Sequence, residues 1–381
     1  MDFLLNEDQK TLKESIRNFA QKEIVPLIKD HDEKGVWPEG LTRKLGEMGL
    51  LGIPFPSDFG GSGYSYVDYV LILEELSKVD PSVGLVVAAH NSLCCNHIFL
   101  FGTESQKKKY LNNLFSGRTL GAWALTEASA GSDAAAMRTR AEKKGDHWVL
   151  NGTKMFITNG SLAEVTVVMA ITDPSKGRNG ISAFILEKGM EGFKPGKKED
   201  KLGIRAADTA ELIFEDVKVP AENILGEPNA GYRQAMAILD GGRVSIAAFA
   251  LGIAAGALET ALKYSKERVQ FNQPISHFQA IQWMLADGFT ELEAARLLTF
   301  RAAFLEDQGK KIPKESAMAK LYASELAVKV SSTAVQILGG YGFTKDYPAE
   351  KFYRDSKLAT IGEGTSEIQR WIIAQKVLEE F

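Results

Sequence analysis

One acidic residue near the C-terminus stands between two glycines, in the segment IGEGTSEIQR at residues 361–370. Gly362 and Gly364 flank Glu363, so the backbone there carries little bulk and a flat molecule can lie against it. A carboxylate in such a place could remove a proton as a general base. The simpler interpretation is a solvated loop acid, because charged residues are mostly exposed. We predict that Glu363 is a catalytic base, on condition that other segments supply the rest of a site.

Two segments in the middle of the chain contain residues that suit a ligand. AWALTEASAGSD, at residues 122–133, combines small residues with the hydroxyls of Thr126 and Ser132, and small residues let a ligand approach the backbone. KMFITNG, at residues 154–160, puts the ring of Phe156 close to the hydroxyl of Thr158, a pair that could flank a planar ring. Taken alone, the first segment could be a turn between domains and the second a packed aromatic.

Three segments in the C-terminal part are of the same kind. Arg243, in LDGGR, could hold a ligand or form a surface ion pair. RVQF at residues 268–271, with Gln279, offers arginine and glutamine that suit a polyphosphate or a ribityl chain; surface pairing is again the alternative. QILGGYG at residues 336–342 ends a helix in glycines, which indicates either a plain helix C-cap or a nucleotide-binding edge.

Hydrophobic periodicity divides the chain into three parts, which we take as domains at residues 1–121, 122–230 and 231–381. The first predicts helices, including an almost wholly apolar one over residues 82–101 whose polar insertions suit either a core or a pocket wall. The second predicts an antiparallel β domain, with Asn151-Gly152 as a hairpin turn. The third predicts helices over residues 235–266, 278–308 and 315–338 and at the C-terminus. The expected fold is therefore α+β, with a C-terminal four-helix bundle.

The last helix should begin directly after the candidate base. Ser366 is expected to cap it, with Gln369 completing a capping box. An apolar face then follows, made of Ile368, Trp371, Ile372 and Val377.

Composition excludes several classes of protein. The chain has 381 residues, a formal net charge of −4 and 25% charged residues, so it has no basic excess for nucleic acid. We expect no metal, because the five histidines lack metal-ligand spacing, and no membrane span, because no run of roughly 18 uninterrupted apolar residues occurs. Cys94 and Cys95 are adjacent, so a disulfide between them would be strained and a reducing compartment is indicated. No GxGxxG unit or P-loop follows a strand, which weakens nicotinamide and nucleotide-hydrolysis interpretations.

The order of these segments along the chain is more specific than any one of them. TEASAGSD, KMFITNG, KLGIRAADTAELIFEDVKVP, LDGGR, RVQFNQPISHFQ, QILGGYGF and EGTSEIQR together resemble the acyl-CoA dehydrogenase family, closest to its short-chain, butyryl-type branch. EELSKVDPSVG, near Glu75, extends the resemblance over essentially the whole chain. It implies the three-part fold above, FAD held between the β domain and the helices, and a homotetramer.

The resemblance also implies roles for individual residues. Glu363 matches the catalytic base of the family. The residues that match FAD contacts are Trp123, Leu125, Thr126, Ser132, Phe156, Ile157, Thr158, Arg268, Phe271, Gln279, Gln336, Gly339, Gly340, Thr365 and Glu367. Arg268, Gln279 and residues 336–340 would reach the FAD of a neighbouring subunit. The residues that match contacts to the CoA thioester are Ser132, Asp240, Arg243 and Gly364.

The implied reaction is α,β-dehydrogenation of an acyl-CoA. Glu363 would take the α-proton while a hydride leaves the β-carbon for flavin N5. Hydrogen bonds from the Glu363 N–H and the flavin ribityl 2′-hydroxyl would stabilise the developing enolate at the thioester carbonyl. Enclosure by apolar groups should raise the pKa of Glu363. Some members carry the base just before the arginine of the LDGGR-like motif, where this chain has Gly242.

Two positions depart from the family pattern. Gly362 stands where the family often has tyrosine, and Ala128 where it often has proline. We draw nothing from the alanine. Loss of the phenol at Gly362 predicts a wider acyl pocket and hence a branched or cyclic substrate, such as a cyclohexane-carboxyl thioester, besides a short straight chain.

Two alternatives stay open within this architecture. One is an oxidase that passes electrons to oxygen, although such members are usually longer at the C-terminus. The other is a catalytically silent module that binds flavin or acyl-CoA, which an intact Glu363 argues against. We expect an electron-transfer flavoprotein as acceptor. We also expect a cytoplasmic enzyme of bacterial type, or the mitochondrial matrix for a mature eukaryotic form.

Overall fold

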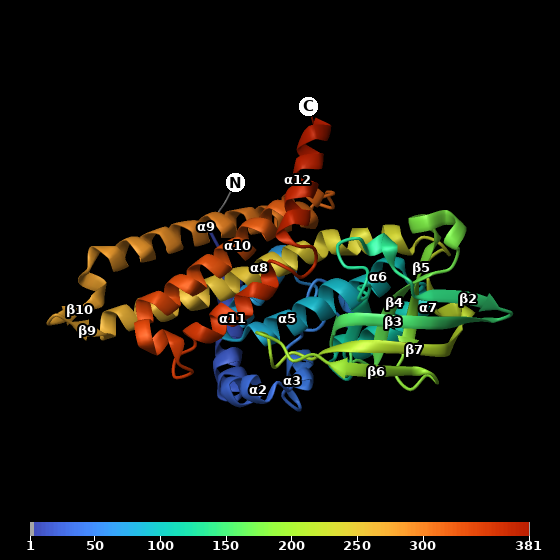
Figure 1. Ribbon diagram of the computed structural model, residues 1–381, viewed down its shortest axis with the longest axis horizontal. Helices are drawn as coiled ribbons and strands as arrows, with labels where there is room; N and C mark the ends of the chain where they lie inside the picture. Colours follow the sequence, from blue (N-terminus) through green and yellow to red (C-terminus); the bar gives the residue numbers. More distant parts are fainter. Residues whose placement is uncertain (1–3, 381) are drawn as a thin grey trace.

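The computed structural model describes residues 4–380, and the ends of the chain at residues 1–3 and 381 lie outside it. The molecule is elongated, with long helices at one end and the β domain at the other (Figure 1). The N-terminal helices lie alongside both the long helices and the β domain. This is the predicted arrangement of helical, β and helical parts.

The N-terminal part is helical, as predicted. Its α-helices are α1 (Glu7–Phe19), α2 (Ile28–Lys34), α3 (Leu41–Glu47), α4 (Tyr66–Val79), α5 (Pro81–Ala89), α6 (Asn96–Phe101) and α7 (Glu104–Phe115). A π-helical turn, His90–Cys95, joins α5 and α6 into one buried helix. Capping boxes at Asn6, Ser65 and Thr103 start α1, α4 and α7, because each side chain accepts a hydrogen bond from the N3 backbone N–H.

The middle part is one eight-stranded sheet in the order β6-β7-β3-β2-β4-β5-β8, with β1 paired to β4. Its strands are β1 (Gly121–Ala124), β2 (Arg140–Lys144), β3 (His147–Thr158), β4 (Val165–Ile171), β5 (Ile181–Glu187), β6 (Phe193–Lys198), β7 (Thr209–Pro220) and β8 (Ile224–Leu225). The prediction of an antiparallel sheet was only partly right, because β1 runs parallel to β4. The β2–β3 hairpin lies between these strands in sequence and lets the chain return in the same direction.

The predicted hairpin turn at Asn151-Gly152 was wrong, because both residues lie inside β3. The pairing of β3 with β7 shifts register between Leu150 and Gly152. The Asn151 side chain bonds Asp216 on β7 twice, through Nδ2 to Oδ1 at 2.9 Å and through Oδ1 to the backbone N–H at 2.8 Å. Gly152 has φ +146° and faces Thr139 so closely that a β-carbon would lie 2.5 Å from Oγ1. The Asn-Gly pair, which also favours a tight turn, therefore forms a β-bulge here.

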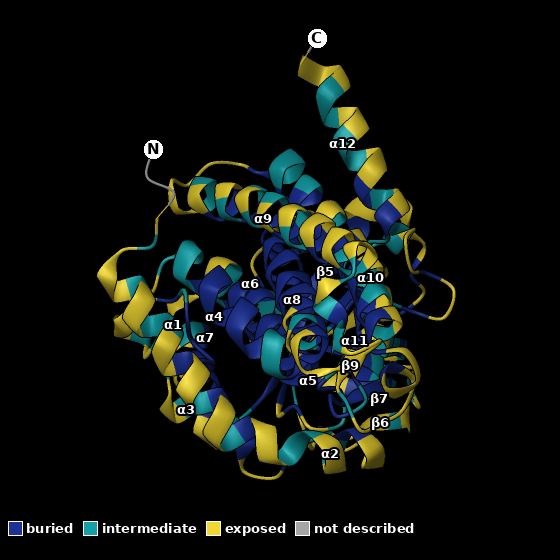
Figure 2. Cartoon of the chain, turned by 90° about the vertical axis from the view of Figure 1, so that its left-hand side faces the viewer, coloured by how far each residue is buried: buried dark blue, intermediate teal, exposed yellow. Residues whose placement is uncertain are grey.

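The C-terminal part contains one more helix than predicted. Its elements are α8 (Gly231–Glu267), β9 (Val269–Gln270), β10 (Gln273–Pro274), α9 (Gln279–Asp307), α10 (Pro313–Leu338), α11 (Ala349–Ala359) and α12 (Ser366–Glu380). Helices α9, α10 and α11 pack around α8. The additional helix is α11, which packs on α8 where the terminal helix was expected. The predicted terminal helix, α12, instead projects from the body, so its apolar face is not in the core (Figures 1 and 2).

Two helices, Pro81–Phe101 and Gly231–Glu267, are long and apolar enough to qualify by composition as membrane spans. In each, 89% of the most apolar window is buried inside the fold. A helix at the centre of a folded domain passes the same test, and Figure 2 shows α5 and α8 as dark, buried helices. These helices are therefore weak support for a membrane span.

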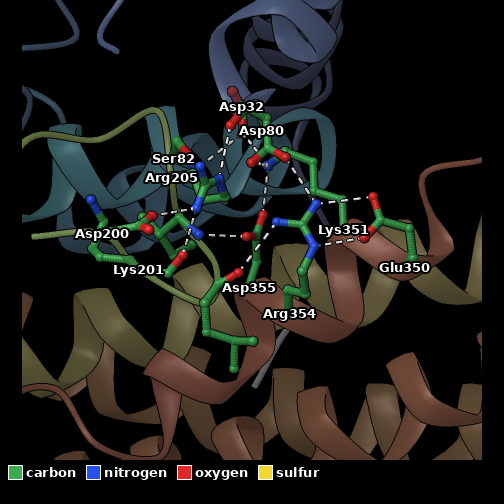
Figure 3. A network of polar contacts seen from close by, with 12 residues as sticks. Asp32, Asp80, Ser82, Asp200, Lys201, Arg205, Glu350, Lys351, Arg354 and Asp355 are labelled. Atoms are coloured by element: carbon green, nitrogen blue, oxygen red, sulfur yellow. Dashed lines mark hydrogen bonds and ion pairs between the residues drawn. The ribbon is translucent and has the colours of Figure 1, made fainter. Parts of the chain in front are cut away.

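A buried network of charges connects the three parts of the chain (Figure 3). Lys351 on α11 bonds Asp80, at the start of α5, at 2.8 Å and Asp355 at 2.6 Å, and lies 4.0 Å from Asp32 on α2. Asp355 accepts the backbone N–H of Ile204, in the segment between β6 and β7. Burial alone would lower the pKa of Lys351, but the carboxylates outweigh burial and raise it. Helix α11 is thus fixed against both other parts.

Replacing Lys351 with methionine should lower the stability of folding by about 3–5 kcal/mol, because three carboxylates would stay buried without this cation. Thermal unfolding followed by circular dichroism measures the loss. Lys10→Met is the matched control, since Lys10 forms an exposed pair with Glu7 at 2.7 Å and should change stability by less than about 1 kcal/mol. Equal melting temperatures for the two variants would contradict this account of the network.

Candidate active site

Glu363 lies in the short turn between α11 and α12. Its backbone is left-handed, with φ 51°, and Gly364 follows with φ 95°. This left-handed backbone favours glycine at residue 364, where a β-carbon would also lie 2.7 Å from Gln369 Nε2. The prediction that Ser366 caps α12 was wrong by one residue. Thr365 Oγ1 accepts the backbone N–H of Ile368 at 3.4 Å, and Gln369 turns back to the carbonyls of residues 363 and 364.

The carboxylate of Glu363 points into the protein. Its Oε2 is buried without a hydrogen-bond partner among the described residues. Gly242 on α8 lies directly against it, since a β-carbon there would be 2.1 Å from Oε2 and 3.4 Å from Leu93 Cδ2. Burial raises the pKa of Glu363 to about 7, and the charges of Lys320 and Arg243 limit the rise. The group can therefore gain and lose a proton near neutral pH.

Gly242 has a structural reason to lack a side chain. Residues 242 and 363 face the same point, so the carboxylate of Glu363 occupies the space that a side chain on Gly242 would need. A base carried at residue 242 would thus reach the place that Glu363 reaches from the opposite side.

One face of the buried Pro81–Phe101 helix adjoins this carboxylate. Leu85, Ala89, Ser92 and Asn96 each retain 5–8% exposure, while neighbours such as Asn91 retain none. These four positions lie on one face of a helix, the face that also carries Leu93. The polar insertions therefore divide between the two predicted roles: Asn91 is a core residue that donates to the Leu50 carbonyl at 3.0 Å, and Asn96 lies on the face beside the site.

Arg243 is not the surface residue that the simpler interpretation expected. It is 6% exposed and donates from Nη1 to Asp240 Oδ1 at 2.5 Å within α8. Its Nε is buried without a partner among the described residues. Burial raises the pKa of Asp240, opposed by Arg243. The pair places an unsatisfied donor in the neighbourhood of Glu363, whose charge acts on Arg243.

The two ligand-suited segments of the middle part lie together. The Lys154 ammonium, which is fully buried, donates to the Leu125 carbonyl and to Glu127 Oε1, both at 2.9 Å. The Met155 N–H donates to the Thr126 carbonyl at 2.9 Å. These bonds tie the end of β3 to the loop that follows β1.

The end of β3 turns an aromatic ring outward. Phe156 has φ 60° at a register shift in the β3–β7 pairing, and its side chain is 60% exposed. Ile157 instead packs into the β core, so its side chain is not available to a ligand. Trp123 is held by its Nε1, which donates to His97 Nδ1 at 2.9 Å. Ser132 lies exposed on the loop.

The other residues predicted to contact FAD lie elsewhere. A pocket of about 470 Å³ is lined by Arg268, Gly339, Gly340 and Tyr341, among others, with Arg268 5.9 Å from the centre of the Tyr341 ring. Phe271, in the turn between β9 and β10, is 87% exposed. Figure 1 places β9 and β10 at the end of the molecule remote from the β domain. One chain therefore does not bring the two groups of residues together.

Several residues that support the site escaped the sequence analysis. Lys154, Glu127, His97 and Lys320 act through burial and through partners distant in sequence, so no local pattern marks them. No cluster of metal-ligating side chains occurs within residues 4–380.

Comparison with known proteins gives matches along almost the whole chain. Models of the acyl-CoA dehydrogenase N-terminal, middle and C-terminal domains match residues 6–118, 122–217 and 229–378. A short-chain specific acyl-CoA dehydrogenase of Clostridium acetobutylicum is 48% identical over 99% of this chain and 100% of its own length.

Two solved structures have the same fold. Butyryl-CoA dehydrogenase from Megasphaera elsdenii superimposes with a TM-score of 0.97 at 46% identity, covering 99% of this chain and 100% of that one. A chain from a structure described as the electron transferring flavoprotein of Acidaminococcus fermentans gives 0.98 at 51% identity, with the same coverage. The buried carboxylate of Glu363 against Gly242, the two linked loops of the β domain and these matches lead to one conclusion: the chain belongs to the acyl-CoA dehydrogenase family.

Proposed function

We propose that this acyl-CoA dehydrogenase oxidises a short-chain, branched or cyclic acyl-CoA to the 2-enoyl-CoA, with Glu363 as the base that removes the α-proton. The observation that carries the proposal is the buried, unpartnered Oε2 of Glu363 against Gly242. A carboxylate that has no partner in the protein is available to a proton of the substrate.

The cofactor is FAD, as in the rest of the family. The residues present fit it: the outward ring of Phe156 and the adjoining loop offer a surface to a planar group, and the pocket beside Arg268 offers a cation and glycine backbone to a pyrophosphate. When bound there, FAD would supply the acceptor for the hydride that leaves the β-carbon. We assign Trp123, Leu125, Thr126, Ser132 and residues 156–158 to its flavin side.

The protein itself holds the thioester and moves the proton. Ser132, Asp240, Arg243 and Gly364 are proposed to hold the CoA thioester, with the Glu363 N–H donating to its carbonyl oxygen. Such fixed donors stabilise charge that develops in the transition state. Glu363 then takes the α-proton on a carboxylate oxygen, and the apolar wall beside Leu93 keeps water away.

Gly362 supports a wide acyl pocket. Unlike Gly364, it does not have a left-handed backbone, so its conformation does not require glycine. The nearest atoms to a β-carbon there would belong to Leu358, at 3.6–3.9 Å, which is ordinary contact. The missing side chain therefore leaves space beside the base, and we infer that a branched or cyclic acyl group fills it.

We infer a homotetramer in which two chains complete each FAD site, because the two groups of predicted FAD contacts lie at opposite ends of the folded molecule. Unpacked apolar side chains supply contact surface: Trp283, Leu297 and Phe304 on α9 and Trp371 and Leu378 on α12 are each more than half exposed. We also infer an electron-transfer flavoprotein as acceptor, supported by the structure from Acidaminococcus fermentans, and a cytoplasmic location, supported by the bacterial relatives.

Glu363→Gln should lower kcat by about 10³-fold or more, because general-base catalysis is lost. In the unmodified enzyme, kcat/KM should fall as the pH drops below about 7, since protonation of Glu363 removes the base. Stopped-flow bleaching of the flavin absorbance by butyryl-CoA measures both. Glu306→Gln is the control, because burial also raises the pKa of Glu306 to about 7. If kcat/KM of this variant no longer fell at acid pH, the fall would be assigned to Glu306 and not to Glu363.

Gly362→Tyr should abolish preference for bulky thioesters and keep turnover of butyryl-CoA within about 10-fold, because the ring would fill the space beside the base. Anaerobic titration with butyryl-, isobutyryl-, 2-methylbutyryl- and cyclohexane-carboxyl-CoA compares the variant with the parent. Unchanged turnover of the branched and cyclic thioesters in the variant would contradict the wide pocket.

Two inactive variants should restore activity when mixed in one assembly. Arg268→Glu should weaken FAD binding and Glu363→Gln should remove the base, so each alone is inactive. If FAD sites are shared between chains, a co-expressed hybrid contains sites with Glu363 from one chain and Arg268 from the other. Activity in tandem-purified hybrids supports sharing, and inactive hybrids that contain both chains would show that each chain builds its own site.

A further inference from the structure

Two buried side chains hold the turn that carries Glu363. Lys320 on α10 donates from Nζ to the Gly364 carbonyl at 2.7 Å. Gln369, in the first turn of α12, donates from Nε2 to the Gly364 carbonyl at 3.0 Å and to the Glu363 carbonyl at 3.2 Å. Both side chains are fully buried. Two successive carbonyls of the turn are therefore fixed by donors that solvent does not reach.

The backbone of Glu363 needs such support. A non-glycine residue in the left-handed region costs roughly 1–2 kcal/mol, and Glu363 is one of these residues. The direction of its N–H and of its side chain follows from this backbone conformation. Loosening the carbonyls would let the turn relax and move both groups from the place that proton removal requires.

Lys320 is unusual among the buried lysines in having no carboxylate partner. Lys154 has Glu127 at 2.9 Å and Lys351 has Asp355 at 2.6 Å, whereas no carboxylate in the described part of the chain lies within 4.0 Å of Lys320 Nζ. A buried ammonium without an ion pair is expensive. Its placement therefore calls for a reason other than stability.

The charges around this ammonium point to the base. Burial lowers the pKa of Lys320 to about 8, opposed first by Glu363 and then, more weakly, by Glu325 and Glu367, while Arg243 lowers it further. Around Glu363 the facing groups are Lys320 on α10, Arg243 on α8 and the buried phenol of Tyr69 on α4. Lys320 thus acts on the carboxylate by charge as well as on the turn by hydrogen bonding.

We propose that Lys320 is a positioning residue for the catalytic base: its hydrogen bond to the Gly364 carbonyl fixes the left-handed turn, and its charge favours the ionised carboxylate of Glu363. The proposal rests on Glu363 being the base. Lys320 is thus given two effects, a hydrogen bond and a charge, which two substitutions distinguish. Lys320→Met removes both the hydrogen bond and the charge, while Lys320→Gln keeps a donor and removes only the charge.

Lys320→Met should lower kcat about 10²-fold, the scale of a misplaced catalytic group, with KM changed less than 3-fold. Loss of the positive charge raises the pKa of Glu363, so the acid limb of kcat/KM should move up by about one pH unit. Lys320→Gln should show the same shift of the limb but keep kcat within about 10-fold of the parent. Lys357→Met is the matched control, because it removes an exposed lysine six residues before Glu363 and should change neither quantity.

Hydrogen–deuterium exchange gives a readout that does not need turnover. The peptide that contains residues 358–370 should exchange faster in Lys320→Met than in the parent or in Lys357→Met, with FAD content and melting temperature as checks on folding. A lower melting temperature with no shift of the acid limb and no faster exchange would make Lys320 merely structural and overturn the proposal. If the parent oxidised none of the acyl-CoAs, the proposed function would fail, and exchange alone would then decide whether Lys320 holds the turn.

Discussion

The site depends on one contact, between the carboxylate of Glu363 and the bare backbone of Gly242. The carboxylate is close enough to α8 to leave no room for a side chain there, and burial in this contact raises its pKa to about 7. The contact requires that the turn between α11 and α12 meets the first third of α8, the central helix of the bundle.

The buried network of charges around Lys351 (Figure 3) positions that turn indirectly, through helix α11. Lys351 and Asp355 hold α11 against α5 and against the segment that leads into β7, and α11 ends four residues before Glu363. Asp80 belongs to the same network and also caps α5, the start of the helix that adjoins the site. The base and this helix are therefore positioned from a common anchor.

The sequence predicted the fold class and the principal helices well, because strong periodicity and capping residues determine them locally. It failed where one local signal serves two structures. Asn151-Gly152 suits a turn or a bulge, and the partner Asp216 decides for the bulge. Helix α11 was missed, and the predicted terminal helix α12 was wrongly placed in the bundle, because an apolar face does not say whether its partner lies in the same chain. Buried lysines such as Lys154 and Lys320 have no local signature at all.

The shared position of residues 242 and 363 has a consequence for how the base could change place during evolution. A glutamate gained at residue 242 would collide with Glu363, and loss of Glu363 alone would leave no base. Each single exchange therefore passes through an enzyme that is impaired. Moving the base from the turn to the central helix therefore requires both changes to be coupled.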